Sequence, residues 1–274
     1  MTDQIAARAA LASDIARRAG QIALDYFRNR ANLKVETKNG ALDLVSVADR
    51  AVEEMIRGEI ARAFPDDAIL GEEGGAGGGT SGLKWVIDPI DGTVPFLMGL
   101  PHWCVVIAIA RGDETLVGVI DVPVTGEHFA ARAGHGVTLD GVRLRLDAER
   151  RIDQSLVAVG ASERCDPRQI SNVIRRLMEA GSIYYRNGSG ANMLACVAAG
   201  RIGGYVEPAM NPWDSLAGLL MIREAGGVTH PFPAETRLGL TLAAAPGVWN
   251  DLVRIASEEL GDLLSPGMLP ADRL

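Results

Sequence analysis

The sequence contains few cysteines and no long apolar run. Only three of its 274 residues are cysteine, and their spacing matches no metal-binding pattern. We therefore expect buried free thiols. The longest apolar runs, such as residues 104–110, are far shorter than the roughly 20 residues that cross a membrane, so no transmembrane segment is expected. The N-terminal segment also lacks the basic start and cleavage site of a signal peptide, which favours a cytoplasmic protein.

An excess of basic residues is also missing. The chain has 27 Lys and Arg against 35 Asp and Glu, a net charge of -8, and only 5% aromatic residues. Nucleic acid is therefore not expected as the main ligand, because proteins that bind it usually carry a basic patch. An acidic protein repels anionic substrates. A phosphate-binding site in this chain would therefore require metal ions.

The apolar pattern predicts a mixed α/β protein. The first half shows helical periodicity and then strands, and the second half alternates strands with helices, which indicates layered α/β structure. The predicted helices cover residues 4–29, 47–64, 167–180, 190–199, 212–225 and 247–260. The predicted strands cover residues 68–73, 84–88, 103–111, 115–122, 127–133, 142–146, 156–160, 183–185, 203–207 and 240–246. The glycine-rich segment 74–82 is typical of a flexible surface loop, or of a gate between Glu72 and Asp88.

Acidic residues gather at the ends of these predicted elements. They are Asp43, Asp49, Glu72, Glu73, Asp88, Asp91 and, much later, Asp214. Each has an ordinary structural explanation, such as turn chemistry or the first turn of a helix. Taken together they suit Mg²⁺, which prefers oxygen ligands and binds through a few carboxylates, waters and substrate phosphate. Two such ions can generate hydroxide and stabilise a leaving oxygen.

The stretch Trp85–Thr93, WVIDPIDGT, carries two of these acids three residues apart. Residues three apart on a regular strand point to opposite faces, so we expect a turn at Pro89 to bring Asp88 and Asp91 together. Haloacid dehalogenase-like phosphatases also end an acidic motif in Asp-Gly-Thr, but their two aspartates are two residues apart. This difference disfavours a covalent aspartyl-phosphate mechanism. Gly92 and Thr93 offer backbone N–H groups for phosphate at the start of a helical turn.

Four motifs together resemble the inositol monophosphatase-like phosphatases, which are Mg²⁺-dependent and typically inhibited by lithium. The motifs are DLVSVAD (43–49), GEE (71–73), WVIDPIDGT (85–93) and WDSLAGLLMIREAGG (213–227). The resemblance implies a five-layered αβαβα sandwich of the inositol monophosphatase and fructose-1,6-bisphosphatase type, usually a homodimer. It predicts one phosphatase unit, with most metal ligands in residues 1–150 and the substrate-hydroxyl site in residues 151–274.

The resemblance also implies roles for single residues. The implied ligands of two to three Mg²⁺ ions are Glu72, Asp88, the carbonyl of Ile90, Asp91 and Asp214. Thr93 and Asp49 would orient and activate the attacking water, assisted by Glu72. The implied contacts to substrate are Gly92 and Thr93 for phosphate, Asp91, Gly188, Ser189 and Glu207 for hydroxyl groups, and Lys38 from a loop near the third metal.

Two departures from the family pattern leave the substrate open. Proline stands at position 95, where many members have asparagine, and the segment around Ser189 carries smaller side chains than usual. The leading hypothesis is hydrolysis of a small polyol phosphate such as myo-inositol 1-phosphate by in-line attack of metal-activated water. One alternative is histidinol phosphate, whose amine could pair with Glu207. A second alternative is a non-catalytic accessory or binding role.

Overall fold

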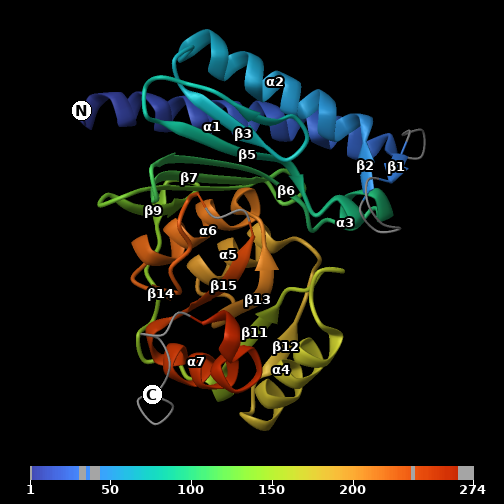
Figure 1. Cartoon of the computed structure of the whole chain (residues 1–274), viewed down its shortest axis with the longest axis vertical. Coiled ribbons are helices and arrows are strands. Elements are labelled where there is room, and N and C mark those ends of the chain that lie inside the picture. The colour runs from blue at the N-terminus through green and yellow to red at the C-terminus, as the bar shows by residue number, and fades with distance from the viewer. Residues whose placement is uncertain (1, 31–34, 38–43, 236–237, 265–274) are drawn as a thin grey trace.

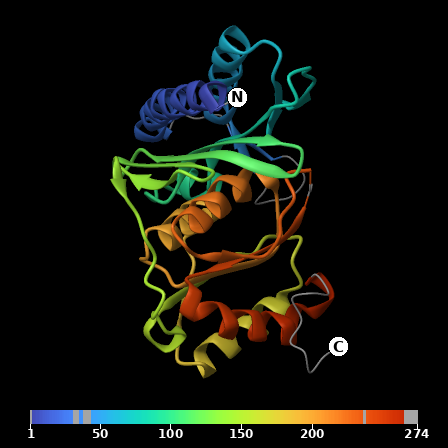
Figure 2. The same cartoon turned by 90° about the vertical axis from the view of Figure 1, so that its left-hand side faces the viewer.

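The computed structural model describes residues 2–30, 35–37, 44–235 and 238–264, and they form five layers. From one end of the molecule to the other, a helix pair, a large sheet, a second helix pair, a smaller sheet and a third helix pair lie on one another (Figure 1). The view turned by 90° shows the same stacking edge-on (Figure 2). The predicted fold class, a five-layered α/β sandwich, is therefore confirmed.

The helices form three of the five layers, two outer ones and one in the middle. Two of them, α1 and α2, cover the outer face of the large sheet; α5 and α6 lie between the sheets; and α4 and α7 close the other end. A short helix, α3, follows strand β5 (Lys84–Asp91) of the large sheet. Their bounds are α1 Thr2–Arg28, α2 Val47–Ala63, α3 Thr93–Met98, α4 Pro167–Glu179, α5 Gly190–Ala198, α6 Pro212–Glu224 and α7 Pro246–Leu260.

The large sheet has eight strands in the order β10-β9-β8-β7-β6-β5-β3-β4 and is antiparallel except for the β3–β5 pair. Its strands are β3 Ala68–Gly71, β4 Gly75–Gly77, β5 Lys84–Asp91, β6 Cys104–Arg111, β7 Glu114–Val122, β8 Glu127–Arg132, β9 Gly136–Leu139 and β10 Val142–Arg143. A separate two-stranded pair, β1 Val35–Thr37 and β2 Leu44–Ser46, precedes α2.

The small sheet has five strands in the order β12-β11-β13-β15-β14. Its first three strands run parallel, and the pairs β13–β15 and β15–β14 are antiparallel. The strands are β11 Leu156–Val159, β12 Ile183–Tyr185, β13 Gly204–Met210, β14 Val228–Thr229 and β15 Gly239–Ala244. The predicted boundary near residue 150 falls between the last strand of the large sheet and the first strand of the small one.

The buried apolar side chains form three clusters, because successive side chains of a strand point to opposite faces of its sheet. On β6, Val105 and Ile107 pack under α1 and α2, whereas Cys104 and Val106 face α5 and α6. A third cluster fills the space between the small sheet and the helices α4 and α7. The middle cluster therefore joins the two sheets through α5 and α6.

The predicted elements agree with the structure within a few residues, and three differences stand out. The segment 74–82 is not only a loop, because Gly75–Gly77 pairs with β3 as strand β4. Strands β1, β2, β9 and β14 were not predicted, since all four are too short for a clear apolar alternation. All three cysteines are free thiols, but Cys196 is only half-buried. Within the described ranges, no helix has both the length and the apolar character to cross a membrane.

Candidate metal and phosphate site

A β-bulge in β5 brings Asp88 and Asp91 to one face of the large sheet. Asp88 pairs with Val106 of β6 and Asp91 pairs with Cys104, so two residues of β5 lie opposite one residue of β6. Val106 and Cys104 are two apart and share a face, and their partners therefore share it too. The predicted turn at Pro89 is wrong: the strand continues through Asp91, and the extra residue in the bulge corrects the spacing.

A third carboxylate comes from α6, in the middle layer. Asp214 lies in the first turn of α6, two residues after Pro212, where a negative charge is favoured by the helix dipole. One oxygen each of Asp88, Asp91 and Asp214 lie within 4.8 Å of one another. The structure therefore brings together three of the predicted metal ligands, from two motifs more than 120 residues apart in the chain.

These carboxylates are electrostatically uncompensated. Burial raises the pKa of Asp88 well above its ordinary value, and the charges of Glu72, Asp214 and Asp91 raise it further. The pKa of Asp214 is raised for the same reasons, burial first and then the charges of Asp91 and Glu72. Among the residues that the structure describes, no arginine or lysine forms an ion pair with Asp88, Asp91 or Asp214. Like charges crowded in this way attract a cation.

The donor set fits a hard divalent cation such as Mg²⁺, because it consists of oxygen atoms alone. Glu72 lies near enough to raise the pKa values of Asp88 and Asp214 but is outside the three-carboxylate cluster. Its backbone N–H donates to the carbonyl of Ile87, 3.2 Å away. The carbonyl of Ile90, also predicted as a ligand, accepts the Thr93 hydroxyl at 3.3 Å.

Asp91 has a second set of partners at the start of α5. The backbone N–H groups of Gly190, Ala191 and Asn192 donate to its carboxylate at 3.2, 2.8 and 3.4 Å, and the Ser189 hydroxyl donates at 2.5 Å. These are the N–H groups that the first turn of a helix leaves without an intrahelical acceptor. Burial raises the pKa of Asp91, and the bonds from Ser189 and Ala191 oppose this effect. Asp91 therefore links the acidic cluster to α5.

Helix α3 begins directly behind Asp91. Its N-cap is Gly92, whose φ of 91° lies in the left-handed region that favours glycine. A β-carbon there would also lie 2.9 Å from the Ser189 side chain. Thr93 is the first helical residue and not the cap. Asp49 lies fully buried in the first turn of α2, on the opposite side of the large sheet from α5.

A cavity of about 130 Å³ adjoins the acidic cluster. Asp91 and Asp214 form one wall, and Gly188, Arg186 and Glu207 lie among the other lining residues. The structure thus places the predicted residues Gly188 and Glu207 at this cavity, whereas Ser189 is fully buried and its hydroxyl donates to Asp91. Burial raises the pKa of Glu207 to about 7, and a hydrogen bond from the Tyr205 hydroxyl opposes the shift.

Two predicted site residues lie outside the described part of the chain, and three residues near the site were not predicted. Lys38 and Asp43 lie outside the described residues. Arg186 and Tyr205 were not predicted. Tyr205 stands two residues before Glu207 on a predicted strand, so its position on the same face was an available signal, whereas no local pattern links Arg186 to Glu207. Glu53, which contacts the backbone after Glu72, was also missed. Its position four residues after Asp49 on the same helix was an available signal, since residues at this spacing share a helix face.

Comparison with known proteins agrees with this geometry. A sequence model described as the inositol monophosphatase family matches residues 5–259. The protein named Nus factor SuhB of Haemophilus influenzae is 38% identical over 245 residues, which cover 87% of this chain and 91% of that protein. A structure of the extragenic suppressor protein suhB from Bartonella henselae superposes with a TM-score of 0.86 at 32% identity, covering 91% of this chain and 98% of that one.

A second solved structure, an IMPase of Thermotoga maritima, superposes with a TM-score of 0.83 at 27% identity. The alignment covers 93% of this chain and 99% of that one. The family match extends over the acids of β5 and over Asp214, which the structure brings together. This chain therefore belongs to the inositol monophosphatase family.

Proposed function

We propose that this protein is a Mg²⁺-dependent phosphomonoesterase that acts on a small polyol phosphate, with myo-inositol 1-phosphate as the first candidate. Membership of the family supports a phosphatase. The observation that carries the proposal is the cluster of Asp88, Asp91 and Asp214, of which the first two are buried and the third is half-buried; among the described residues no arginine or lysine pairs with them, and a cavity adjoins them. A cation there would neutralise the acids and make the site attractive to a phosphate dianion.

In this proposal, the carboxylates of Asp88, Asp91 and Asp214, with Glu72 and the carbonyl of Ile90, would hold two to three Mg²⁺ ions. Bound Mg²⁺ lowers the pKa of water and stabilises the charge on the leaving oxygen. The bonds from α5 leave Asp91 fixed in orientation, so that it presents the same oxygen to the site at each turnover. Metal binding and the geometry of α5 are therefore linked through one side chain.

The chain's own residues would position the reactants and move one proton. The backbone N–H groups of Gly92 and Thr93 bind phosphate oxygens, and the Thr93 hydroxyl orients the attacking water. The proton of this water passes to the carboxylate of Asp49, through Thr93, as general-base catalysis requires. Attack is in line: the bond from phosphorus to the ester oxygen breaks as the bond to water forms, the leaving oxygen takes a proton from solvent water, and the alcohol departs toward the cavity that Gly188 and Glu207 line.

The cavity favours an alcohol with several hydrogen-bond donors. A Glu207 carboxylate accepts hydrogen bonds from substrate hydroxyls, as predicted for an inositol ring. The same carboxylate also supports the alternative substrate, histidinol phosphate, whose amine it could pair with. Arg164 and Arg186 act against the raised pKa of Glu207, which favours its ionised form when substrate arrives.

An accessory role is the candidate from another class. It is supported by relatives that are named Nus factor SuhB, which associates those proteins with transcription. The described metal-ligand candidates are all retained in this chain, so an accessory role would accompany hydrolysis instead of replacing it. In either case, we propose a lithium-sensitive homodimer.

The test is a phosphate-release screen of the purified protein over inositol, histidinol, sugar and nucleotide monophosphates. With Mg²⁺ we expect turnover, with myo-inositol 1-phosphate the best substrate, and with excess EDTA we expect none. Equal hydrolysis after verified metal removal would contradict the metal site. Absence of hydrolysis on every substrate, in protein shown to bind Mn²⁺, would favour the accessory role. Size-exclusion chromatography tests the proposed homodimer, and a LiCl titration of the activity tests the proposed lithium sensitivity.

A further inference from the structure

Glu53 is a buried carboxylate on α2 that the proposed mechanism does not use. It is 2% exposed and lies one helical turn after Asp49, on the same face of α2. A buried carboxylate is costly unless it is paired and hydrogen-bonded. Its partners therefore indicate what the side chain does.

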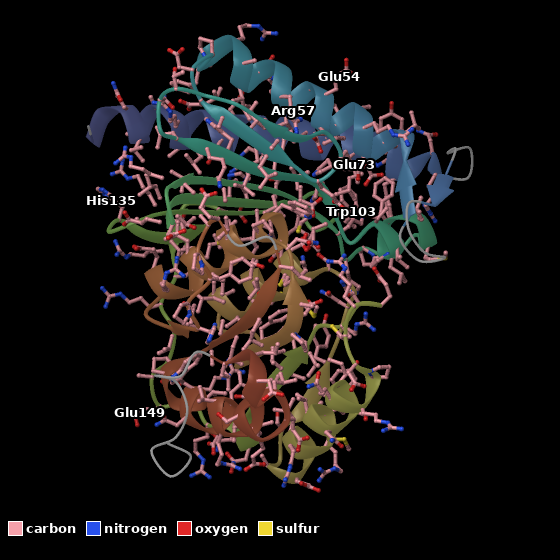
Figure 3. All side chains as sticks on the ribbon, viewed as in Figure 1. Glu54, Arg57, Glu73, Trp103, His135 and Glu149 are labelled. Atoms are coloured by element: carbon pink, nitrogen blue, oxygen red, sulfur yellow. The ribbon has the colours of Figure 1, made fainter. Side chains whose placement is uncertain are left out.

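Both oxygens of Glu53 hold the backbone that follows Glu72. Oε2 accepts the N–H of Glu73 at 2.8 Å, and Oε1 accepts the N–H of Gly74 at 2.7 Å. Oε1 also accepts Nε of Arg57 at 2.6 Å, and the same guanidinium donates to the carbonyl of Gly75 at 2.5 Å. Figure 3 shows Arg57 on α2 and Glu73 just below it. Glu53 and Arg57 thus form a clamp on residues 73–75.

Glu72 needs such an external support. Its negative charge raises the pKa values of Asp88 and Asp214, which shows that the three carboxylates repel one another. Without a cation, this repulsion favours conformations in which Glu72 turns away from the two aspartates. Strand pairing between Gly71 and Gly75 holds the two ends of this turn. The glycines at 74 and 75 have little conformational preference of their own and leave the orientation of Glu72 undetermined.

The space for the clamp depends on residue 74. A β-carbon at Gly74 would lie 2.7 Å from Oε1 of Glu53 and 2.8 Å from Nε of Arg57. Any larger residue would displace one of these two side chains. On the opposite side, the N–H of Glu72 is bonded to Ile87, next to Asp88. The Glu72 backbone is therefore held from α2 and from β5 at once.

We propose that Glu53 is a positioning residue for the metal site, which fixes the turn at 72–74 so that Glu72 faces Asp88 and Asp214 before metal binds. This inference rests on the proposed function. Glu53 acts through the backbone and does not touch the metal or the substrate. It also ties the turn to α2, the helix that carries Asp49.

The test compares Glu53→Gln with Glu59→Gln. Glutamine is nearly isosteric but sets an NH₂ group against the backbone donors of the turn. Glu59 lies on the same helix and pairs with Arg18 and Arg62 at 2.9 and 2.5 Å, without a hydrogen bond to the turn. The control therefore also loses an acid–arginine contact on α2. Two readouts are used: amide hydrogen exchange of the peptide covering residues 72–77 in EDTA, and Mn²⁺ binding followed by electron paramagnetic resonance.

For Glu53→Gln we expect faster exchange of the Glu73 and Gly74 amides in EDTA and a Mn²⁺ affinity lower by about tenfold or more. The control should match wild type in both. Wild-type exchange and Mn²⁺ affinity in a folded Glu53→Gln protein would overturn the inference. If Glu53→Gln fails to fold, Gly74→Ala tests the same clamp from the turn, with the same expected changes. A wild-type protein that binds no Mn²⁺ and hydrolyses no substrate would overturn the proposed function, and the inference with it.

Discussion

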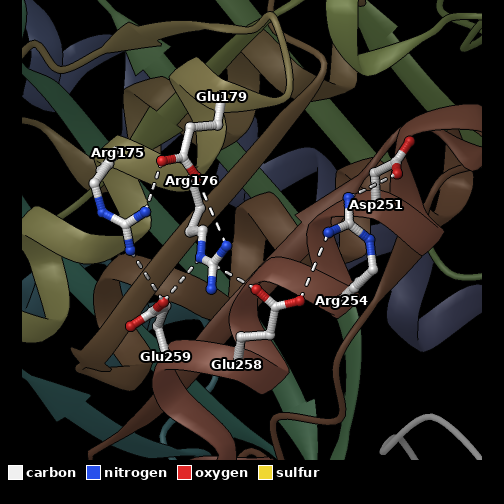
Figure 4. A network of polar contacts seen from close by, with 7 residues as sticks. All are labelled: Arg175, Arg176, Glu179, Asp251, Arg254, Glu258 and Glu259. Carbon is white, nitrogen blue, oxygen red and sulfur yellow. Dashed lines mark hydrogen bonds and ion pairs between the residues drawn. The ribbon is translucent and has the colours of Figure 1, made fainter.

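Two acid-rich regions of this molecule differ in whether their carboxylates are paired with arginines. Between α4 and α7, four acids interleave with three arginines (Figure 4). Arg176 pairs with three of these acids, Glu179, Glu258 and Glu259, at 3.2 to 3.6 Å. At the metal site, Asp88, Asp91 and Asp214 face one another, and the described residues supply no arginine or lysine as a partner.

The pKa values of the two regions are shifted in ways that reflect this difference in pairing. Hydrogen bonding to Glu259 and the charge of Glu258 raise the pKa of Arg176, which favours its charged form. Burial and neighbouring acids raise the pKa of Asp88, which disfavours its charged form. The network on the surface is complete by itself. The buried cluster is complete only with a cation, and this incompleteness is what points to function.

The largest expected effect concerns the proposed proton-transfer pair. Thr93→Ala and Asp49→Asn should each lower kcat by about 10²- to 10⁴-fold, the range for a positioned proton-transfer group. Because both residues would act as one unit, the double variant should lose little more than either single one. The measurements are kcat at saturating Mg²⁺ and a melting curve for each variant. Small, additive losses in kcat would show that the two residues are structural.

The next effect tests the uncompensated charge directly. Asp88→Asn should lower kcat by about 10²-fold or more, because an amide is a poorer Mg²⁺ ligand. In EDTA, the same variant should melt at an equal or higher temperature than wild type, since it loses a buried and repelled carboxylate. Asp214→Asn should behave alike. A variant with wild-type kcat, or one that melts well below wild type without metal, would contradict the comparison.

The pH dependence of stability follows from the raised pKa of Glu207. The folded state holds this proton up to a pH of about 7, and the unfolded state releases it near 4.5. The folded protein therefore binds more protons in this window, and its stability falls as pH rises from 5 to 8. Glu207→Gln should remove part of this fall, up to about 3 kcal/mol. Urea unfolding in EDTA at both pH values measures it, and identical pH slopes for the two proteins would refute the effect.

The smallest effect is expected in the α4–α7 network. Arg176→Met removes the arginine that pairs with three acids, but these side chains are partly exposed to water. We expect a decrease in melting temperature of about 3 °C or less, with kcat and the Mg²⁺ requirement unchanged. Thermal melting measures the change in stability, and phosphate release at several Mg²⁺ concentrations measures kcat and the Mg²⁺ requirement. A change in the Mg²⁺ requirement would show that the two acid-rich regions are coupled.

The periodicity of apolar residues predicted most of the fold. Residues 4–29 and 247–260 carry apolar side chains at helical spacing, and strands such as 104–110 are continuous apolar runs, so local pattern determined their type. It could not reveal β4, because Gly75, Ala76 and Gly77 carry almost no apolar signal and pair with β3 only when the sheet forms. Nor could it reveal the bulge in β5, which exists only relative to β6.

For the site, the sequence by itself determined which side chains carry oxygen ligands: the acids of the four motifs. Only the tertiary structure decided which of them meet. It joined Asp214 to Asp88 and Asp91 by packing α6 against β5, bound the start of α5 to Asp91, and set Glu53 behind Glu72. The physical reason is that composition and spacing fix local conformation and chemistry, whereas distances between elements far apart in the chain depend on the packing of the buried core.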